Sequence, residues 1–174
     1  PGAIPYLEKA VAARPDPATI ALLGDVYKMA GRDSDAARQY ELLDKIAVMG
    51  AQNGNIYGRE LAMYYANHDI KVAEACDASV KEYETRRDIY GADAVAWTCF
   101  KAGRLEEAKR AMKDALRLGT KDAQLFYHAG MIEKAAGDQA VARTMLEKAV
   151  RLNPYFDPLQ AIAARSALKE LGGK

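Results

Sequence analysis

The sequence contains two histidines and two cysteines, residue types that can bind a metal ion or take part in covalent catalysis. Neither His68 nor His128 has cysteine, histidine or carboxylate companions at the spacing of a metal site. Cys76 and Cys99 lack the number and spacing of a metal site or a disulfide framework. Both lie in apolar helical patterns, so we interpret them as small buried side chains. The sequence predicts no metal and no cofactor.

Other forms of catalysis find no better support. Nucleophilic catalysis needs a base within reach of a nucleophile, and no serine or cysteine carries a recognisable local signature of that arrangement. The glycines occur singly and form no phosphate-binding loop. Glu106 and Arg110 are spaced as an i,i+4 pair on a solvated helix face. We therefore expect a protein that is not an enzyme.

Charge and hydropathy bear on two kinds of partner, nucleic acid and the lipid membrane. The formal net charge is +1, and Lys and Arg alternate with Asp and Glu along the expected helices. A basic surplus or stripe is typical of nucleic-acid binding, so no nucleic acid is expected. No run approaches the roughly 18 apolar residues of a membrane-spanning helix, so direct membrane insertion is not expected either. The compartment stays open.

An internal repeat is the most informative feature. The segment from Lys101 recurs from Ala135, and four small or apolar positions return 34 residues later. The four pairs are Gly103 and Gly137, Ala108 and Ala142, Ala115 and Ala149, and Leu118 and Leu152. Gly31 and Ala36 match the same pattern, and a degenerate copy places Asp69 at the turn and Ala73 at the small position. The period predicts helical hairpins with small residues where paired helices come close.

These residues resemble the tetratricopeptide repeat family over essentially the whole chain. The last repeat matches at Phe126, Gly130, Gly137, Ala142, Leu146, Ala149 and Pro154, and the first at Leu23, Gly24, Tyr27, Gly31, Ala36 and Tyr40. The resemblance implies an all-α fold, a right-handed α-α superhelix that ends in a C-terminal capping helix. Gly31, Gly103 and Gly137 would take positive φ after the first helix of each hairpin.

The repeat divides a single solenoid domain, residues 1–174, into parts. We expect a partial repeat at 3–14, repeats at about 17–50, 55–88, 90–120 and 122–154, and a capping helix at 157–171. Asp157 would cap this last helix and Pro158 would lie in its first turn. Phe156, Leu159, Ile162, Leu168 and Leu171 would form its apolar face. Because 3–14 resembles a second helix without its partner, we expect the superhelix to continue upstream, as a fragment of a longer repeat protein.

The resemblance also implies where a ligand would bind, since in this family the first helices line a concave groove. Helical periodicity then selects ten side chains that face it. They are Arg59, Met63, Asn67, Asp93, Trp97, Lys101, Tyr127, His128, Met131 and Lys134. Met63, Trp97, Tyr127 and Met131 would form an apolar centre, and aromatic residues are over-represented among binding hot spots. The alternative for Trp97 and Met131 is ordinary packing between repeats.

The sequence therefore predicts a non-catalytic protein–protein interaction scaffold whose groove holds a peptide or partner segment. Two alternatives stay open. One is a self-associating homo-oligomeric scaffold, in which the incomplete repeat or the groove docks onto another copy. An exposed apolar face of Ile4, Tyr6 and Leu7 could also cause artefactual dimers. The other is an accessory recruitment domain of a larger enzyme or membrane-anchored protein.

Overall fold

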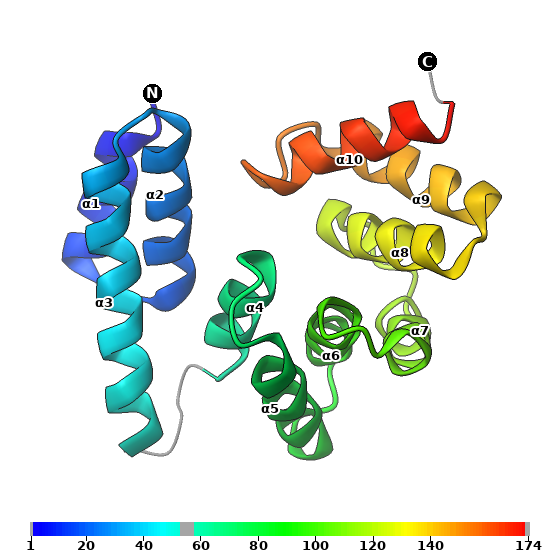
Figure 1. Ribbon diagram of the computed structural model, residues 1–174, viewed down its shortest axis with the longest axis horizontal. Coiled ribbons are helices and arrows are strands. Elements are labelled where there is room, and N and C mark those ends of the chain that lie inside the picture. Colours follow the sequence, from blue (N-terminus) through cyan, green and yellow to red (C-terminus); the bar gives the residue numbers. More distant parts are fainter. Residues whose placement is uncertain (1, 53–57, 173–174) are drawn as a thin grey trace. The chain divides into compact units, whose positions relative to one another are not determined.

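The computed structural model describes residues 2–52 and 58–172, and these residues form helices without a β-strand. In chain order the helices are α1 (Ile4–Ala13), α2 (Pro17–Met29), α3 (Asp33–Gln52), α4 (Gly58–Asn67), α5 (Val72–Thr85), α6 (Ile89–Lys101), α7 (Leu105–Ala115), α8 (Ala123–Ala136), α9 (Gln139–Leu152) and α10 (Gln160–Glu170). The chain forms two compact units, Pro1–Tyr64 (unit 1) and Tyr65–Lys174 (unit 2), and the division falls within α4 (Figure 1).

Unit 1 is built on the hairpin of α2 and α3, against which α1 packs. Asp16 caps α2 by accepting the N–H of Thr19 at 3.0 Å. Gly24 is where the hairpin is tightest, because a Cβ there would lie 2.5 Å from the ring of Tyr40. Ile4 of α1 joins the buried core, and Leu7 packs against it. Of the exposed apolar face expected at Ile4, Tyr6 and Leu7, only Tyr6 is largely exposed.

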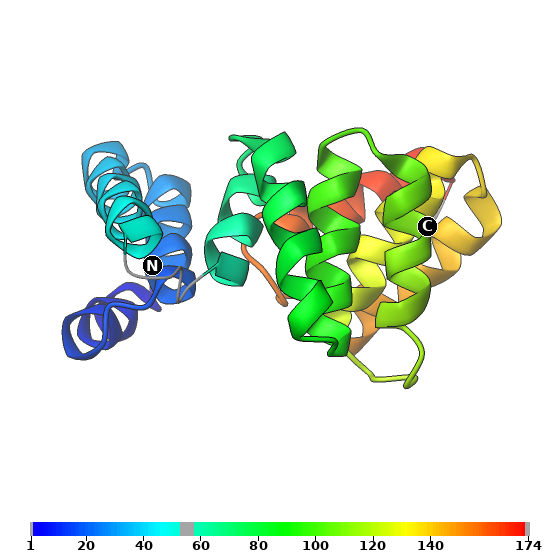
Figure 2. The ribbon, with the colours of Figure 1, turned by 90° about the horizontal axis from the view of Figure 1, so that it is seen from below.

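Unit 2 contains two helical hairpins, α6 with α7 and α8 with α9, in which successive helices run side by side (Figures 1 and 2). Its core joins small residues of both hairpins to Leu125 and Ile132 of α8. Gly130 lets α8 approach α9, because a Cβ there would lie 2.7 Å from Leu146 Cγ. The expectation that small residues set the closest approach is confirmed at Gly24 and Gly130.

The turns inside the hairpins follow one pattern. Gly31, Gly103 and Gly137 have φ of +71°, +77° and +88°, as predicted from their place after the first helix. In each case the next residue donates its N–H to the carbonyl oxygen five residues earlier, for example Arg104 to Cys99 at 2.8 Å. The turn after α4 makes the same bond, from Ile70 to the Tyr65 carbonyl at 2.9 Å.

The turn after α4 differs from the other three turns in its backbone conformation. This difference corrects the predicted alignment of the second repeat. Asp69 and Lys71 take positive φ, at +57° and +46°, where the other turns use one glycine. Helix α5 therefore starts one residue later relative to the pattern. The buried small residue is Ala75, whose N–H donates to the Lys71 carbonyl as that of Ala108 does to Arg104. Ala73, predicted for this place, is exposed, so that assignment is wrong.

The C-terminal helix also differs from its prediction. Asp157 does act as a cap, accepting the N–H groups of Leu159 and Gln160 at 2.8 and 2.7 Å. It caps a turn, however, and α10 begins only at Gln160. The buried face of α10 is made of Gln160, Ala161, Ala164 and Ala167, whereas Ile162 is half exposed. The predicted apolar face is wrong at Ile162 only, since Phe156, Leu159, Leu168 and Leu171 are partly buried. The buried alanines allow α10 to lie close to α8 and α9.

Candidate functional site

The ten side chains predicted for the groove divide between the two units. Arg59 and Met63 belong to unit 1, on its part of α4, and both are partly exposed. The other eight belong to unit 2 and come from the end of α4, from α6 and from α8. Within unit 2 the structure brings most of these eight into direct contact. We call the group Asn67, Asp93, Trp97, Tyr127 and His128 the inner cluster.

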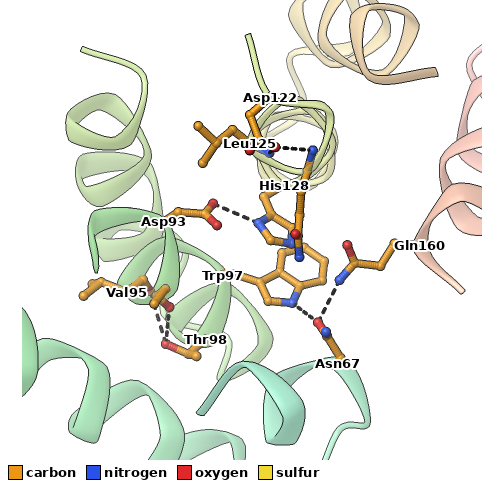
Figure 3. A network of polar contacts seen from close by, with 11 residues as sticks. Asn67, Asp93, Val95, Trp97, Thr98, Asp122, Leu125, His128 and Gln160 are labelled. Atoms are coloured by element: carbon orange, nitrogen blue, oxygen red, sulfur yellow. Dashed lines mark hydrogen bonds and ion pairs between the residues drawn. The ribbon is translucent and has the colours of Figure 1, made fainter. Parts of the chain in front are cut away.

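The centre of the inner cluster is a buried, hydrogen-bonded pair of side chains on two adjacent first helices. His128 of α8 and Asp93 of α6 are joined by a 2.8 Å contact between Nδ1 and Oδ1 (Figure 3). Because a carboxylate can only accept, the ring donates from Nδ1. The other ring nitrogen, Nε2, is buried and has no hydrogen-bond partner among the described residues. The pair thus fixes the ring and leaves one buried nitrogen unsatisfied.

Trp97 connects this pair to α4. Its ring stacks on His128 with centroids 4.2 Å apart, and its indole N–H donates to Asn67 Oδ1 at 2.7 Å (Figure 3). Tyr127 also packs against Trp97, with 5.5 Å between the ring centroids. Trp97 is only 3% exposed. Its side chain is therefore packed between first helices, and its polar edge is satisfied within the protein.

Residues 155–160, which comprise the turn before α10 and its first residue, cover the inner cluster. Gln160 Nε2 donates to the same Asn67 oxygen at 2.8 Å, so that Asn67 accepts from both Trp97 and Gln160 (Figure 3). The ring of Phe156 packs on Tyr127 with centroids 5.5 Å apart. Burial raises the pKa of Tyr127 to about 12, and the negative charge of Asp157 contributes to the rise. Three residues of the 155–160 segment thus act on the inner cluster.

Sequence reasoning did not find Phe156 and Gln160 as members of this site. Gln160 and Asn67 are 93 positions apart, and Gln160 lies outside the predicted repeats, in the predicted capping helix. The sequence did place Phe156 on the apolar face of the capping helix, and Asp157 with Pro158 at the start of that helix, but it predicted no contact with the first helices. The missing information is where α10 lies once it has formed, which depends on tertiary packing.

Two lysines lie at the border of the cluster and remain partly exposed. Lys101 Nζ lies 2.6 Å from Asp69 Oδ1 and 5.7 Å from the centroid of the Trp97 ring. Lys134 of α8 forms an ion pair with Glu170 of α10. Met131 is half-buried on the same helix. Lys101, Lys134 and Met131 therefore expose cationic and apolar atoms next to the buried inner cluster.

The geometry of the histidine bears on what chemistry the cluster can do. Although His128 and Asp93 are paired as a base and its orienting acid would be, no hydroxyl or thiol among the described residues is hydrogen-bonded to Nε2. The ring is also completely buried. The described residues therefore do not assemble a nucleophile, base and acid in sequence. His68, the second histidine, lies in the turn after α4.

The cysteines form a disulfide, which corrects the interpretation of them as free buried side chains. Cys76 of α5 and Cys99 of α6 are bonded, with Cα atoms 4.7 Å apart. Their sulfurs lie with a Glu107 oxygen inside a 4.8 Å group of the kind that holds metal ions. Bonded sulfurs are not thiolates, however, and the thiolate is the ligand form of cysteine. The bond ties α5 to α6.

A separate hollow is lined by residues of α7, α8 and α9. Its volume is about 520 Å³, its floor includes Met112 and Met145, and Lys109, Arg110 and Lys113 stand at its margin. None of the ten predicted residues lines it. Lys109 and Lys113 of this hollow can therefore serve as controls for Lys101 and Lys134 in binding experiments.

Comparison with known proteins identifies one region of the chain. Residues 123–156 match the sequence profile of a family described as tetratricopeptide repeat. The match covers α8, α9 and the loop as far as Phe156. No curated protein matches the chain. Among the described residues, no helix combines the length and apolar character needed to cross a membrane.

Proposed function

Because the chain is a tetratricopeptide repeat protein, an all-α solenoid of helical hairpins, we propose that it is a non-catalytic scaffold that binds a peptide or segment of another protein on its first helices. Repeats of this family generally mediate protein–protein interaction. The proposed face is the one around the inner cluster of unit 2, bordered by Lys101, Met131 and Lys134.

One observation carries this proposal: aromatic and polar side chains of α4, α6 and α8 converge on a single point. Trp97, Tyr127 and His128 pack ring against ring, and Asn67 supplies a hydrogen-bond acceptor beside them. These rings are buried, so they hold in place the first helices whose accessible side chains are Lys101, Met131 and Lys134. The cationic border would orient an acidic or C-terminal part of the guest.

The absence of catalysis belongs to the same proposal. Folds of this type typically serve as scaffolds without catalytic activity. In this chain the histidine that could act as a base is buried and hydrogen-bonded only to Asp93 among the described residues. A catalytic base must reach the proton that it removes. We therefore assign the His128–Asp93 pair to the architecture of the face and not to chemistry.

A peptide selection followed by affinity measurement tests the proposal. Peptides selected from a random library on the purified full chain are measured against wild type and against a Lys101→Ala, Lys134→Ala double variant. We expect the double variant to bind at least ten-fold more weakly, because it removes two charges at the border of the face. The matched control, Lys109→Ala with Lys113→Ala on α7, should change affinity less than two-fold. Equal losses in both variants, or a loss in the control alone, would place binding elsewhere.

A further inference from the structure

We infer that residues 155–160 are an intramolecular ligand of the inner cluster, and that they show the chemistry of the partner: an aromatic side chain followed four residues later by a carboxamide. This inference rests on the proposed function and goes beyond it, because it names the features that the guest must carry. It also assigns a regulatory role to the segment, which the guest has to displace.

The carboxamide contact is the first step. Asn67 Oδ1 has two acceptor positions, and it receives the Trp97 indole N–H at 2.7 Å and the Gln160 amide at 2.8 Å. Trp97 belongs to the rigid part of the face, but Gln160 is contributed by the C-terminal segment. The second acceptor position of Asn67 is therefore a docking point for an amide N–H that arrives from outside the first helices.

The aromatic contact is the second step. Phe156 packs on Tyr127 in a tilted arrangement with centroids 5.5 Å apart, which is a favourable geometry for two aromatic rings. Tyr127 in turn contacts Trp97. Phe156 is thus the outermost member of an aromatic series that starts on α6, and it is the only member that the repeat hairpins do not supply.

The turn between these two residues sets their spacing. Asp157 accepts the N–H groups of Leu159 and Gln160, and Pro158 restricts the backbone between them. Phe156 and Gln160 are therefore presented together without any need for a helix between them. Tyr155, the neighbouring aromatic residue, is 84% exposed and takes no part. The segment presents one aromatic side chain and one amide to the face, as a bound peptide would.

The face is not completely satisfied by this segment. His128 Nε2 and Gln160 Oε1 are both buried without a hydrogen-bond partner among the described residues. Buried polar atoms are normally paired, and an unpaired one carries a cost. A guest that also donates a hydrogen bond to His128 Nε2 would recover that cost. It could then compete with a segment whose attachment to the chain gives it an effective concentration of the order of millimolar.

The test uses the full chain and a labelled peptide of residues 153–162, NPYFDPLQAI. Fluorescence anisotropy is measured with wild type, with the Phe156→Ala, Gln160→Ala double variant, and with Tyr155→Ala as the matched control. We expect the double variant to bind the peptide at least ten-fold more tightly than wild type, because its own segment no longer competes. Tyr155→Ala should behave as wild type, and a peptide in which both residues are alanine should not bind the double variant.

Equal affinity of wild type and the double variant, or no binding to a double variant that retains its helical circular dichroism, would overturn the inference. A second measurement covers a double variant that fails to fold. Trp97 is the only tryptophan, so its fluorescence in wild type should change at millimolar peptide, and an unchanged spectrum would equally overturn the inference. If library peptides still depend on Lys101 and Lys134 while this peptide fails, the intramolecular ligand is refuted and the proposed function stands.

Discussion

At the scale of single residues, the proposed face depends on side chains that fix one another. His128 is oriented by Asp93, Trp97 lies against His128, and Asn67 holds the indole N–H of Trp97. Side chains held in this way lose little conformational entropy when a ligand arrives, which favours tight and selective binding. The same coupling means that a substitution inside the cluster alters both stability and binding. Substitutions at the border of the cluster, at Lys101 and Lys134, separate an effect on binding from an effect on stability better.

Tyr127 gives a prediction at this scale. Its pKa is raised from 10.0 to about 12 by burial and by the charge of Asp157. The folded protein therefore keeps the phenol proton between those pH values, where the unfolded chain has lost it. The resulting stabilisation is present below pH 10 and is lost as the pH rises toward 12.

We expect wild type to lose about 2 kcal/mol more than Tyr127→Phe between pH 9 and pH 11.5, from the shift of about two units. Urea unfolding of both proteins at the two pH values measures the difference. Other tyrosines whose pKa is raised, such as Tyr27 and Tyr40, are present in both proteins and cancel. Identical alkaline losses would show that the Tyr127 hydroxyl is not held in this environment.

What the sequence could predict about single residues follows from their periodicity. The repeat placed Asp93, Trp97, Tyr127 and His128 on one face of their helices, and these residues do meet. Periodicity gives the direction of a side chain but not what covers it. Trp97 was expected either in an open groove or between repeats. It is buried between first helices and beneath a segment that starts almost 60 residues later.

At the scale of elements, turn chemistry decided which predictions succeeded. A glycine after a first helix is a direct signal of positive φ, and Gly103 and Gly137 follow it. Asp69 and Lys71 adopt positive φ without such a signal, so the shifted start of α5 could not be read from the residues. The disulfide was missed for a related reason. Twenty-three residues separate Cys76 and Cys99, and only the packing of α5 on α6 brings them together.

The disulfide gives a prediction at the scale of these two helices. It closes a loop defined by a sequence separation of 23, and the loop-entropy model assigns such a bond about 3 kcal/mol. Adding a reductant should therefore lower the urea midpoint of unit 2 in wild type. A Cys76→Ala, Cys99→Ala variant should not respond to the reductant. The denatured, unreduced chain should contain no free thiol, and two reactive thiols in that assay would refute the bond.

The disulfide also decides under which redox conditions the protein should be prepared. Disulfides persist in oxidising compartments and are kept reduced in the cytosol. Protein prepared under oxidising conditions is therefore the appropriate material for the binding experiments. In reduced protein the contact between α5 and α6 depends on packing alone, through Cys76, Cys99 and their apolar neighbours.

At the scale of the whole molecule, the division into two compact units limits what each part contributes. Unit 2 contains eight of the ten predicted residues together with the segment that covers them, so the proposed site is argued from unit 2 by itself. Unit 1 carries Arg59 and Met63. Its exposed Tyr6 stands apart from a face that is otherwise buried or partly buried at Ile4 and Leu7, which leaves little apolar surface there for self-association.

Hydrogen exchange of the full chain, with and without a peptide selected on it, tests the central claim most directly because it locates binding along the sequence. The account predicts slower exchange in α6 and α8, together with faster exchange in residues 155–160 as the guest displaces them. Slower exchange confined to α7 and α9, with residues 155–160 unchanged, would contradict it.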